Sequence, residues 1–199
     1  MTEYALPSCY HNMLRQLLRD VIDIFNENNI LYWIDGGTML GSVRDSKFIP
    51  HDDDVDLGTT LENFNKIIKL QHKFTDIGYY FQKLDGMIKV WIPMGWIPMN
   101  DKLMPPPTLD IFLYHKKNKY YVLQNLPLRL RYLHAKYKVN DLFPLETVLF
   151  EGIKVNIANT PYPYLDMSYP NWRTEYVIDI RENIKDKRQI IIPINNNNG

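Results

Sequence analysis

Four carboxylates crowd into five positions at one point of the chain, in the segment Asp52-Asp53-Asp54-Val55-Asp56. Two unit charges ~4 Å apart repel each other by about 4 kcal/mol near a protein surface, so the fold must either solvate this segment or neutralise it. In a β-strand, the alternation around Val55 directs Asp54 and Asp56 to one face while the valine points to the core. The segment therefore favours a fold that presents carboxylates on one face of a short strand.

The composition places the chain among ordinary globular proteins. Its 199 residues are 45% hydrophobic and 23% charged, and the formal net charge is zero. One domain is expected at this length, and a zero net charge argues against a nucleic-acid-binding coat or a membrane-surface protein. A single cysteine, Cys9, excludes an internal disulfide framework and a cysteine-rich zinc site.

The two ends of the sequence carry expectations of their own. The start, MTEYALPSCYHN, lacks the basic stretch and apolar run of a signal peptide. No stretch approaches the ~18 consecutive apolar residues of a membrane span, so we expect a cytoplasmic protein without one. A single domain is expected over residues 1–192, followed by a disordered Asn-rich tail over 193–199.

The hydrophobic pattern predicts a mixture of helices and strands, and therefore an α+β fold with a mixed sheet flanked by helices. Thr59 and Glu62 fit a capping box that would open one helix. The prolines of residues 92–107 predict a long loop, and a polar tail is expected after residue 167. Other helices are predicted at 8–29, 38–43, 128–137 and 162–167, and strands at 30–34, 55–57, 79–84, 87–91, 109–114, 120–123, 148–150 and 153–157.

Three features are expected to converge on one site. The run Asp35–Thr38 follows a strand and opens a helix, where paired glycines let the backbone approach a phosphate and the helix N-terminus supplies N–H donors. Asp110 is the sole charge in the apolar strand 109–113, and a carboxylate there is costly unless it is paired or bound to a metal. If this strand neighbours that of Asp54 and Asp56, the three aspartates form an oxygen-ligand site suited to Mg²⁺.

A calcium loop and a plain acidic turn also fit parts of the acidic segment, and both stay open at this point. A calcium-binding EF-hand loop would place Asp52, Asp54 and Asp56 at its first, third and fifth positions. However, Leu57 stands where that loop needs glycine, and Asn63 where it needs glutamate. A plain acidic turn remains possible, but it leaves Asp110 unexplained.

The segment Gly36–Gly58 resembles the signature of the LicD/fukutin family of the nucleotidyltransferase superfamily. The family pattern runs roughly GTLLG-x-x-R, a short loop, and then F-I-P-W-D-D-D-[IV]-D. In this chain His51 stands in place of the tryptophan, and Leu109–Phe112 is similar to a later D-I-F segment of the family. The resemblance implies a nucleotidyltransferase-like mixed sheet. The matching residues are Gly37–Gly41, Arg44, Phe48–Pro50 and Asp52–Asp56.

The resemblance also implies a function. Family members transfer a phospho-alcohol, such as phosphocholine or ribitol phosphate, from a CDP-linked donor to a sugar hydroxyl of a glycan. Asp54 and Asp56 would bind Mg²⁺, with Mn²⁺ as an alternative, and Asp110 would complete the metal site and accept the hydroxyl proton. Residues expected to hold the donor phosphates are Gly36, Gly37, Thr38 and Arg44.

Several points stay open on the sequence alone. Asp52 and Asp53 are expected to orient and support the metal ligands rather than to bind the metal. Arg44 could equally form a salt bridge to Asp45 or Asp52. Lys89 could reach a phosphate from its apolar strand, but extension to solvent is expected. A nucleotidyltransferase that attaches NMP to a small molecule or protein is one alternative function. A non-catalytic module that binds a glycan or a protein is the other.

Overall fold

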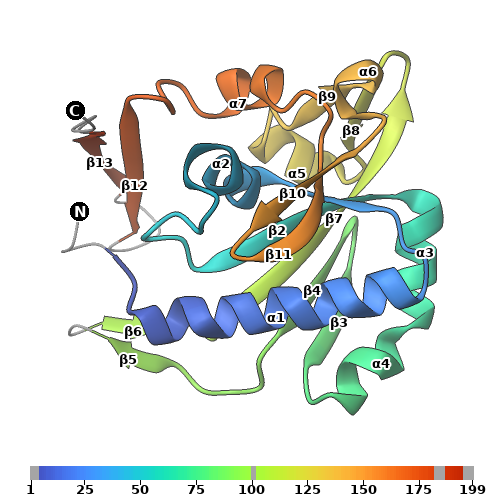
Figure 1. Ribbon diagram of the computed structural model, residues 1–199, viewed down its shortest axis with the longest axis horizontal. Coiled ribbons are helices and arrows are strands. Elements are labelled where there is room, and N and C mark those ends of the chain that lie inside the picture. Colours follow the sequence, from blue (N-terminus) through green and yellow to red (C-terminus); the bar gives the residue numbers. More distant parts are fainter. Residues whose placement is uncertain (1–4, 100–101, 182–186, 195–199) are drawn as a thin grey trace.

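The computed structural model describes residues 5–99, 102–181 and 187–194, and a curled mixed sheet lies at its centre (Figure 1). Two strands of this sheet are parallel neighbours and the other pairs are antiparallel. This confirms the predicted mixed sheet flanked by helices. The strand order is β1 (Tyr32–Ile34), β2 (Asp54–Thr60), β7 (Thr108–Lys117), β4 (Met87–Trp91), β3 (Tyr80–Leu84), with β8 (Tyr120–Leu123) and β9 (Lys136–Lys138) extending it from β7.

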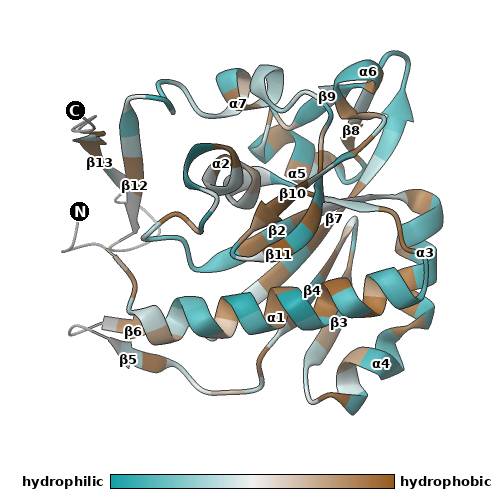
Figure 2. Cartoon of the chain, viewed as in Figure 1, coloured by the Kyte–Doolittle hydropathy of each residue, from teal (hydrophilic) through white to brown (hydrophobic). Residues whose placement is uncertain are grey.

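The first helix, α1 (Ser8–Glu27), crosses one face of the sheet (Figure 1). Its apolar residues recur at the spacing of an amphipathic helix, and hydrophobic and hydrophilic residues alternate along it in Figure 2. Leu14, Leu17 and Leu18 are fully buried, and each such side chain stabilises the fold by about 1.5–3 kcal/mol relative to an exposed one. The other helices are α2 (Gly36–Asp45), α3 (Leu61–Lys69), α4 (Gln71–Asp76), α5 (Leu126–Arg131), α6 (Val139–Leu142) and α7 (Tyr162–Ser168).

The register of the sheet sorts its side chains into two faces, because paired residues on neighbouring strands point the same way. Val55 of β2 pairs with Leu109 of β7, and both are fully buried in the core against which α1 packs. Asp56, Asp110 and Lys89 form a row across β2, β7 and β4 on the opposite face. The predicted carboxylates thus occupy the face that α1 does not cover.

Two segments that were predicted to lack strands form hairpins. Within residues 92–107, Pro98 lies in a strand, because both strands of a two-stranded hairpin are edges and one of them tolerates a missing N–H. The predicted polar tail is also wrong, since a second hairpin follows α7. These two hairpins are β5 (Ile97–Met99) with β6 (Lys102–Met104), and β12 (Glu175–Arg181) with β13 (Lys187–Pro193). A third, β10 (Glu146–Phe150) with β11 (Ile153–Ile157), confirms the two strands predicted there.

Smaller differences concern helix ends and the chain terminus. The helix predicted over 128–137 ends at Arg131, because the residues that follow reach β9 and pair with β8. The capping box is wrong, since the Thr59 hydroxyl donates to the Leu31 carbonyl from within β2. The Ile194 N–H donates to a carbonyl 2.7 Å away, so the start of the predicted tail is ordered. Residues 195–199 lie outside the described residues.

None of the helices in the described ranges combines the length and the apolar character that crossing a membrane requires.

Candidate active site

The aspartates of β2 and β7 lie on neighbouring strands, as the sequence analysis required. The parallel register pairs Asp56 with Asp110 and Asp54 with Thr108. Asp54 and Asp56 are half-buried, and Asp110 is 8% exposed. The three predicted metal ligands therefore share one face of the sheet.

Asp110 forms an ion pair with Lys89, a residue that the sequence analysis expected to extend to solvent. The Lys89 ammonium lies 2.6 Å from its Oδ1, so Lys89 does not simply extend to solvent. Burial raises the pKa of Asp110, and the Lys89 charge opposes that rise. The register between β4 and β7, which places Lys89 opposite Asp110, was the missing information. This ion pair explains a carboxylate in an apolar strand without any metal.

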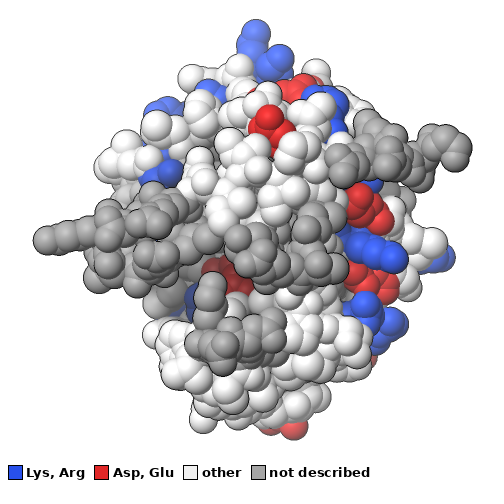
Figure 3. All heavy atoms as spheres, turned by 90° about the vertical axis from the view of Figure 1, so that its left-hand side faces the viewer, with Lys and Arg blue, Asp and Glu red and all other residues white. Residues whose placement is uncertain are grey.

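The acidic segment divides differently from the prediction. Asp52 and Asp53 precede the strand, and carboxylate oxygens of Asp52, Asp53 and Asp54 lie within 4.8 Å of one another. Among the described residues, these three form the group of potential metal ligands with oxygens this close together, and Asp56 and Asp110 do not belong to it. Asp52 and Asp53 were predicted only to support the metal ligands, but their oxygens lie close enough to Asp54 to bind a metal themselves. Figure 3, which faces the left-hand side of Figure 1, shows acidic atoms in a recess.

The electrostatics of this group favour a cation. Burial, and then the charges of neighbouring aspartates, raise the pKa of Asp52 and of Asp56 well above the usual carboxyl range. The Arg44 guanidinium partly offsets this rise at Asp52. Oxygen ligands in this number suit a hard divalent ion such as Mg²⁺. The charge of the ion would replace the repulsion among the carboxylates with attraction and would favour their ionised forms.

Asp56 is held by the turn that opens α2. The Gly37 N–H donates to its Oδ2 over 3.1 Å, and the Asp56 N–H donates to the Thr38 hydroxyl over 2.8 Å. The Asp35 N–H donates to the Asp56 carbonyl over 2.9 Å. The Gly37 N–H and the Thr38 hydroxyl, which were predicted to bind phosphate, thus contact Asp56 of β2 in this structure and position it.

The same contacts explain why the turn contains two glycines. Gly36 has φ +49°, and a Cβ added there would lie 2.3 Å from the Asp56 carboxylate. A Cβ at Gly37 would lie 2.6 Å from Asp52. Real side chains do not approach so closely, so the glycine pair lets the backbone lie against both acidic residues.

Asp35 is a residue of the site whose role sequence reasoning missed. It is 2% exposed, and its carboxylate accepts hydrogen bonds from the hydroxyls of Tyr114 (2.7 Å) and Tyr137. Burial raises the pKa of Asp35, and these tyrosine hydrogen bonds oppose the rise. Tyr137 stacks on Tyr164 with 4.5 Å between the ring centroids. The only sequence signal was a carboxylate placed directly after a buried strand.

Arg44 lies beside the acidic segment, and its side chain is largely buried. Its side chain is 8% exposed, its Nε lies 3.0 Å from Asp45, and its guanidinium lies 3.9 Å from the ring centroid of Tyr176. The predicted alternative, a salt bridge to Asp45, is therefore present. Nη2 is buried and finds no hydrogen-bond partner within the described residues.

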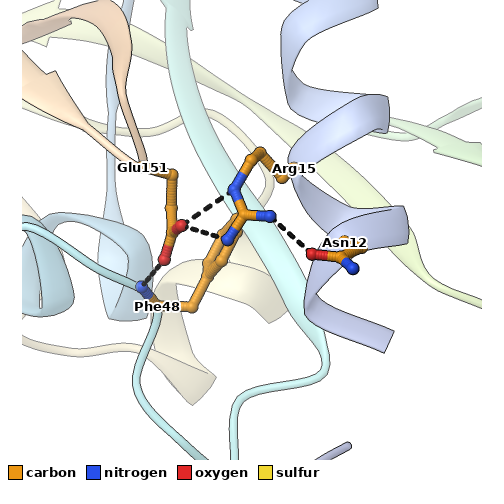
Figure 4. A network of polar contacts seen from close by, with 4 residues as sticks. All are labelled: Asn12, Arg15, Phe48 and Glu151. Atoms are coloured by element: carbon orange, nitrogen blue, oxygen red, sulfur yellow. Dashed lines mark hydrogen bonds and ion pairs between the residues drawn. The ribbon is translucent and has the colours of Figure 1, made fainter. Parts of the chain in front are cut away.

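The loop that leads to the acidic segment is fixed from two sides. Figure 4 shows Glu151, in the turn between β10 and β11, accepting from the Phe48 N–H (2.9 Å) and from Arg15 of α1 (2.6 and 2.9 Å). The Tyr10 hydroxyl of α1 lies 3.1 Å from the Asp53 carbonyl and 3.0 Å from the Pro105 carbonyl. Contacts distant in sequence therefore set the position of the carboxylates.

Comparison with known proteins places these features in a family. Residues 29–160 match the model of the LicD/FKTN/FKRP nucleotidyltransferase domain. Uncharacterized protein RP689 of Rickettsia prowazekii (strain Madrid E) is 30% identical over 161 residues, which cover 80% of this chain and 54% of that protein. Ribitol-5-phosphate transferase FKTN of Homo sapiens is 23% identical over 163 residues, covering 80% of this chain and 33% of FKTN.

Two further similarities are more limited. Ribitol 5-phosphate transferase FKRP of Homo sapiens is 37% identical over 65 residues, covering 33% of this chain and 13% of FKRP. The crystal structure of ANT(2")-Ia in complex with adenylyl-2"-tobramycin aligns with a TM-score of 0.46 at 17% identity, covering 72% of this chain and 67% of that one. This chain spans about half the length of RP689 and less of the other curated relatives named here. The match over residues 29–160 shows that the chain belongs to the LicD/FKTN/FKRP family.

Proposed function

We propose that this protein is a transferase that moves a phospho-alcohol from a CDP-linked donor to a sugar hydroxyl of a glycan, with Mg²⁺ as cofactor. The observation that carries the proposal is the pairing of Asp56 with Asp110 on adjacent strands, beside the glycine turn, on the sheet face away from α1. Family membership supports the transferase class, because relatives named FKRP and FKTN are ribitol-phosphate transferases.

The residues present fit a divalent cation. Asp52, Asp53 and Asp54 offer oxygens that lie close together, and Asp56 and Asp110 continue the acidic row on the same face. When bound, Mg²⁺ would neutralise charge on the transferred phosphoryl group. Asp54, Asp56 and Asp110 remain the proposed ligands, and the geometry adds Asp52 and Asp53 as candidates.

The protein's own groups would divide the remaining work. Gly36, Gly37 and Thr38 set the position of Asp56, and Arg44, whose buried Nη2 has no hydrogen-bond partner within the described residues, would bind a donor phosphate. The Lys89 charge opposes protonation of Asp110 and so favours the ionised form, which a general base needs.

The proposed reaction is a single displacement. The acceptor oxygen forms a bond to the phosphorus that carries the alcohol, and the bond from that phosphorus to the bridging oxygen breaks. CMP leaves, and the hydroxyl proton passes to Asp110. Such transfers depend on positioning and charge stabilisation more than on covalent chemistry.

Product analysis tests the proposal. The purified protein would be incubated with CDP-choline, CDP-ribitol or CDP-glycerol, a glycan panel and Mg²⁺, and released CMP measured. Asp110→Asn and Asp54→Asn should lose turnover while their thermal unfolding stays cooperative. Undiminished turnover in either variant would refute the assignment.

One second candidate has an observation in its favour. The family model is described as a nucleotidyltransferase domain, so the chain could attach NMP from a nucleoside triphosphate. Pyrophosphate release would identify that reaction, whereas CMP release identifies phospho-alcohol transfer. Absence of any donor-induced thermal stabilisation with Mg²⁺ present would favour a non-catalytic binding module.

A further inference from the structure

The sheet face that carries the carboxylates continues beyond Asp110 onto β4 and β3. Register pairs Gln82 with Lys89 and Tyr80 with Trp91, so these four side chains project from the same face as Asp110. Tyr80 is 56% exposed, Gln82 is exposed, and Lys89 and Trp91 are half-buried. Beyond Asp110, the carboxylate face therefore stays open to solvent.

The opposite face of β4 behaves differently. Val90 and Ile88 alternate with Lys89 and Trp91 along β4, and both are fully buried in the core. Solvent exposure on β4 is thus a property of one face and not of the strand as a whole.

Tyr80 and Trp91 form an aromatic pair on this open face. Their ring centroids are 5.4 Å apart and their planes are inclined by 53°. Within the described residues, neither ring belongs to the hydrophobic core or to the half-buried side chains that pack against it. Two large aromatic rings that add nothing to the core present a flat apolar surface to a ligand.

The pair lies next to the proposed base. Lys89 is directly opposite Asp110, and Trp91 is opposite Thr108, which places Trp91 diagonally across from Asp110. Diagonal neighbours on antiparallel strands lie about 7–8 Å apart, which is close to the span of one sugar ring. A sugar whose hydroxyl reaches Asp110 would therefore lie over Trp91 and Tyr80.

The strand order decides which substrate this surface faces. The glycine turn contacts β2, and the order β1-β2-β7-β4-β3 puts that turn and the aromatic pair on opposite sides of Asp110. Phosphoryl transfer places the attacking and leaving oxygens roughly in line, on opposite sides of the phosphorus. With donor phosphates at Arg44 of α2, the helix that packs on β2, the acceptor approaches from β4 and β3.

We propose that Tyr80, Trp91 and Gln82 form the subsite for the acceptor sugar, an inference that rests on the proposed transferase function. The C–H face of a pyranose packs on the two rings, and the Gln82 amide hydrogen-bonds to ring hydroxyls. Lys89 lies between this subsite and Asp110 and keeps the proposed base in place through their ion pair.

Binding of methyl glycosides tests the subsite directly. Methyl glycosides of glucose, galactose, N-acetylglucosamine and N-acetylgalactosamine would be titrated by saturation-transfer NMR, with Mg²⁺ and CMP present. Tyr80→Ala and Gln82→Ala should each weaken the glycoside that binds best about fivefold or more, because truncating an anchoring contact typically has this effect. Tyr162→Ala is the control, since Tyr162 is 52% exposed on α7, and it should leave binding unchanged.

Donor binding separates this inference from the proposed function. CDP-choline, CDP-ribitol and CDP-glycerol affinities should change less than about twofold in Tyr80→Ala, and Trp91→Phe should reproduce the selective effect on the sugar. If Tyr80→Ala instead weakened donor binding, Tyr80 and Trp91 would be assigned to the nucleobase and the inference would be overturned. The inference would also be overturned if wild type bound no glycoside, or if no variant altered glycoside binding. Glycoside binding lost in Tyr80→Ala, with no donor bound by wild type, would support the subsite and refute the transferase.

Discussion

Replacing Glu151 with alanine should destabilise the protein even though Glu151 lies outside the proposed catalytic residues. Its side chain is 8% exposed and accepts hydrogen bonds from the Phe48 N–H and from Arg15. The backbone at Glu151 has φ +52°, and alanine keeps the Cβ, so the substitution leaves the local backbone strain unchanged. The effect therefore reports on the lost carboxylate alone.

Two contributions set the magnitude. The Phe48 N–H would lose its acceptor, and an unsatisfied buried donor costs about 1–3 kcal/mol. The ion pair adds no more than ~1 kcal/mol, because the Arg15 side chain is 35% exposed and solvent screens it. The free energy of unfolding should therefore fall by about 1–4 kcal/mol in Glu151→Ala, which corresponds to a Tm lower by roughly 2–16 °C at this chain length.

Urea denaturation followed by circular dichroism measures the change. Glu151→Gln keeps an acceptor for the Phe48 N–H, so it should lose less than half as much stability. Glu62→Ala is the control, because Glu62 forms an exposed ion pair within α3 and its loss should leave the free energy of unfolding within error. A Glu151→Ala protein within ~0.5 kcal/mol of wild type would refute the reasoning, since surface substitutions produce changes of that size.

Two further predictions concern the carboxylate strand. Thr38→Val should lower the free energy of unfolding by about 1–3 kcal/mol, because it leaves the Asp56 N–H without its acceptor. Thr38→Ser should recover most of the loss in the same urea experiment, and equal losses would show that the hydroxyl is irrelevant. In chelator-treated protein, the native pKa of Asp52 lies above its unfolded value of about 3.8, so the charged form opposes folding as pH rises through that interval. Asp52→Asn should therefore gain Tm relative to wild type as pH rises, Mg²⁺ should reduce the gain, and a difference independent of pH would contradict the raised pKa.

Local patterns predicted the parts of the fold that depend on nearby residues. The helical spacing of Leu14, Leu17 and Leu18 identified α1, and the alternation of Asp54 with Asp56 identified β2 and its exposed face. The sequence reasoning also anticipated that the strand of Asp110 neighbours β2. These features require only one or two elements to be recognised.

The rest depends on the register between elements, which a single sequence does not encode locally. Lys89 meets Asp110 only because β4 and β7 pair at one particular offset. Asp35 is enclosed by Tyr114 and Tyr137, which lie 79 and 102 residues away. The predicted helix 128–137 includes the first two residues of β9, because pairing with β8, and not the local pattern, determines their conformation.

The residues that hold the acidic segment in place lie partly outside the stretch that the family model matches. Tyr10 and Arg15 precede the stretch matched by the family model, and Tyr164 and Tyr176 follow it. A fragment of residues 29–160 would contain every proposed ligand and yet lack the groups that immobilise the ligand-bearing loop and cover Arg44. The family boundaries thus delimit a recognisable stretch of sequence, whereas the unit able to fold into a functional site is the larger one.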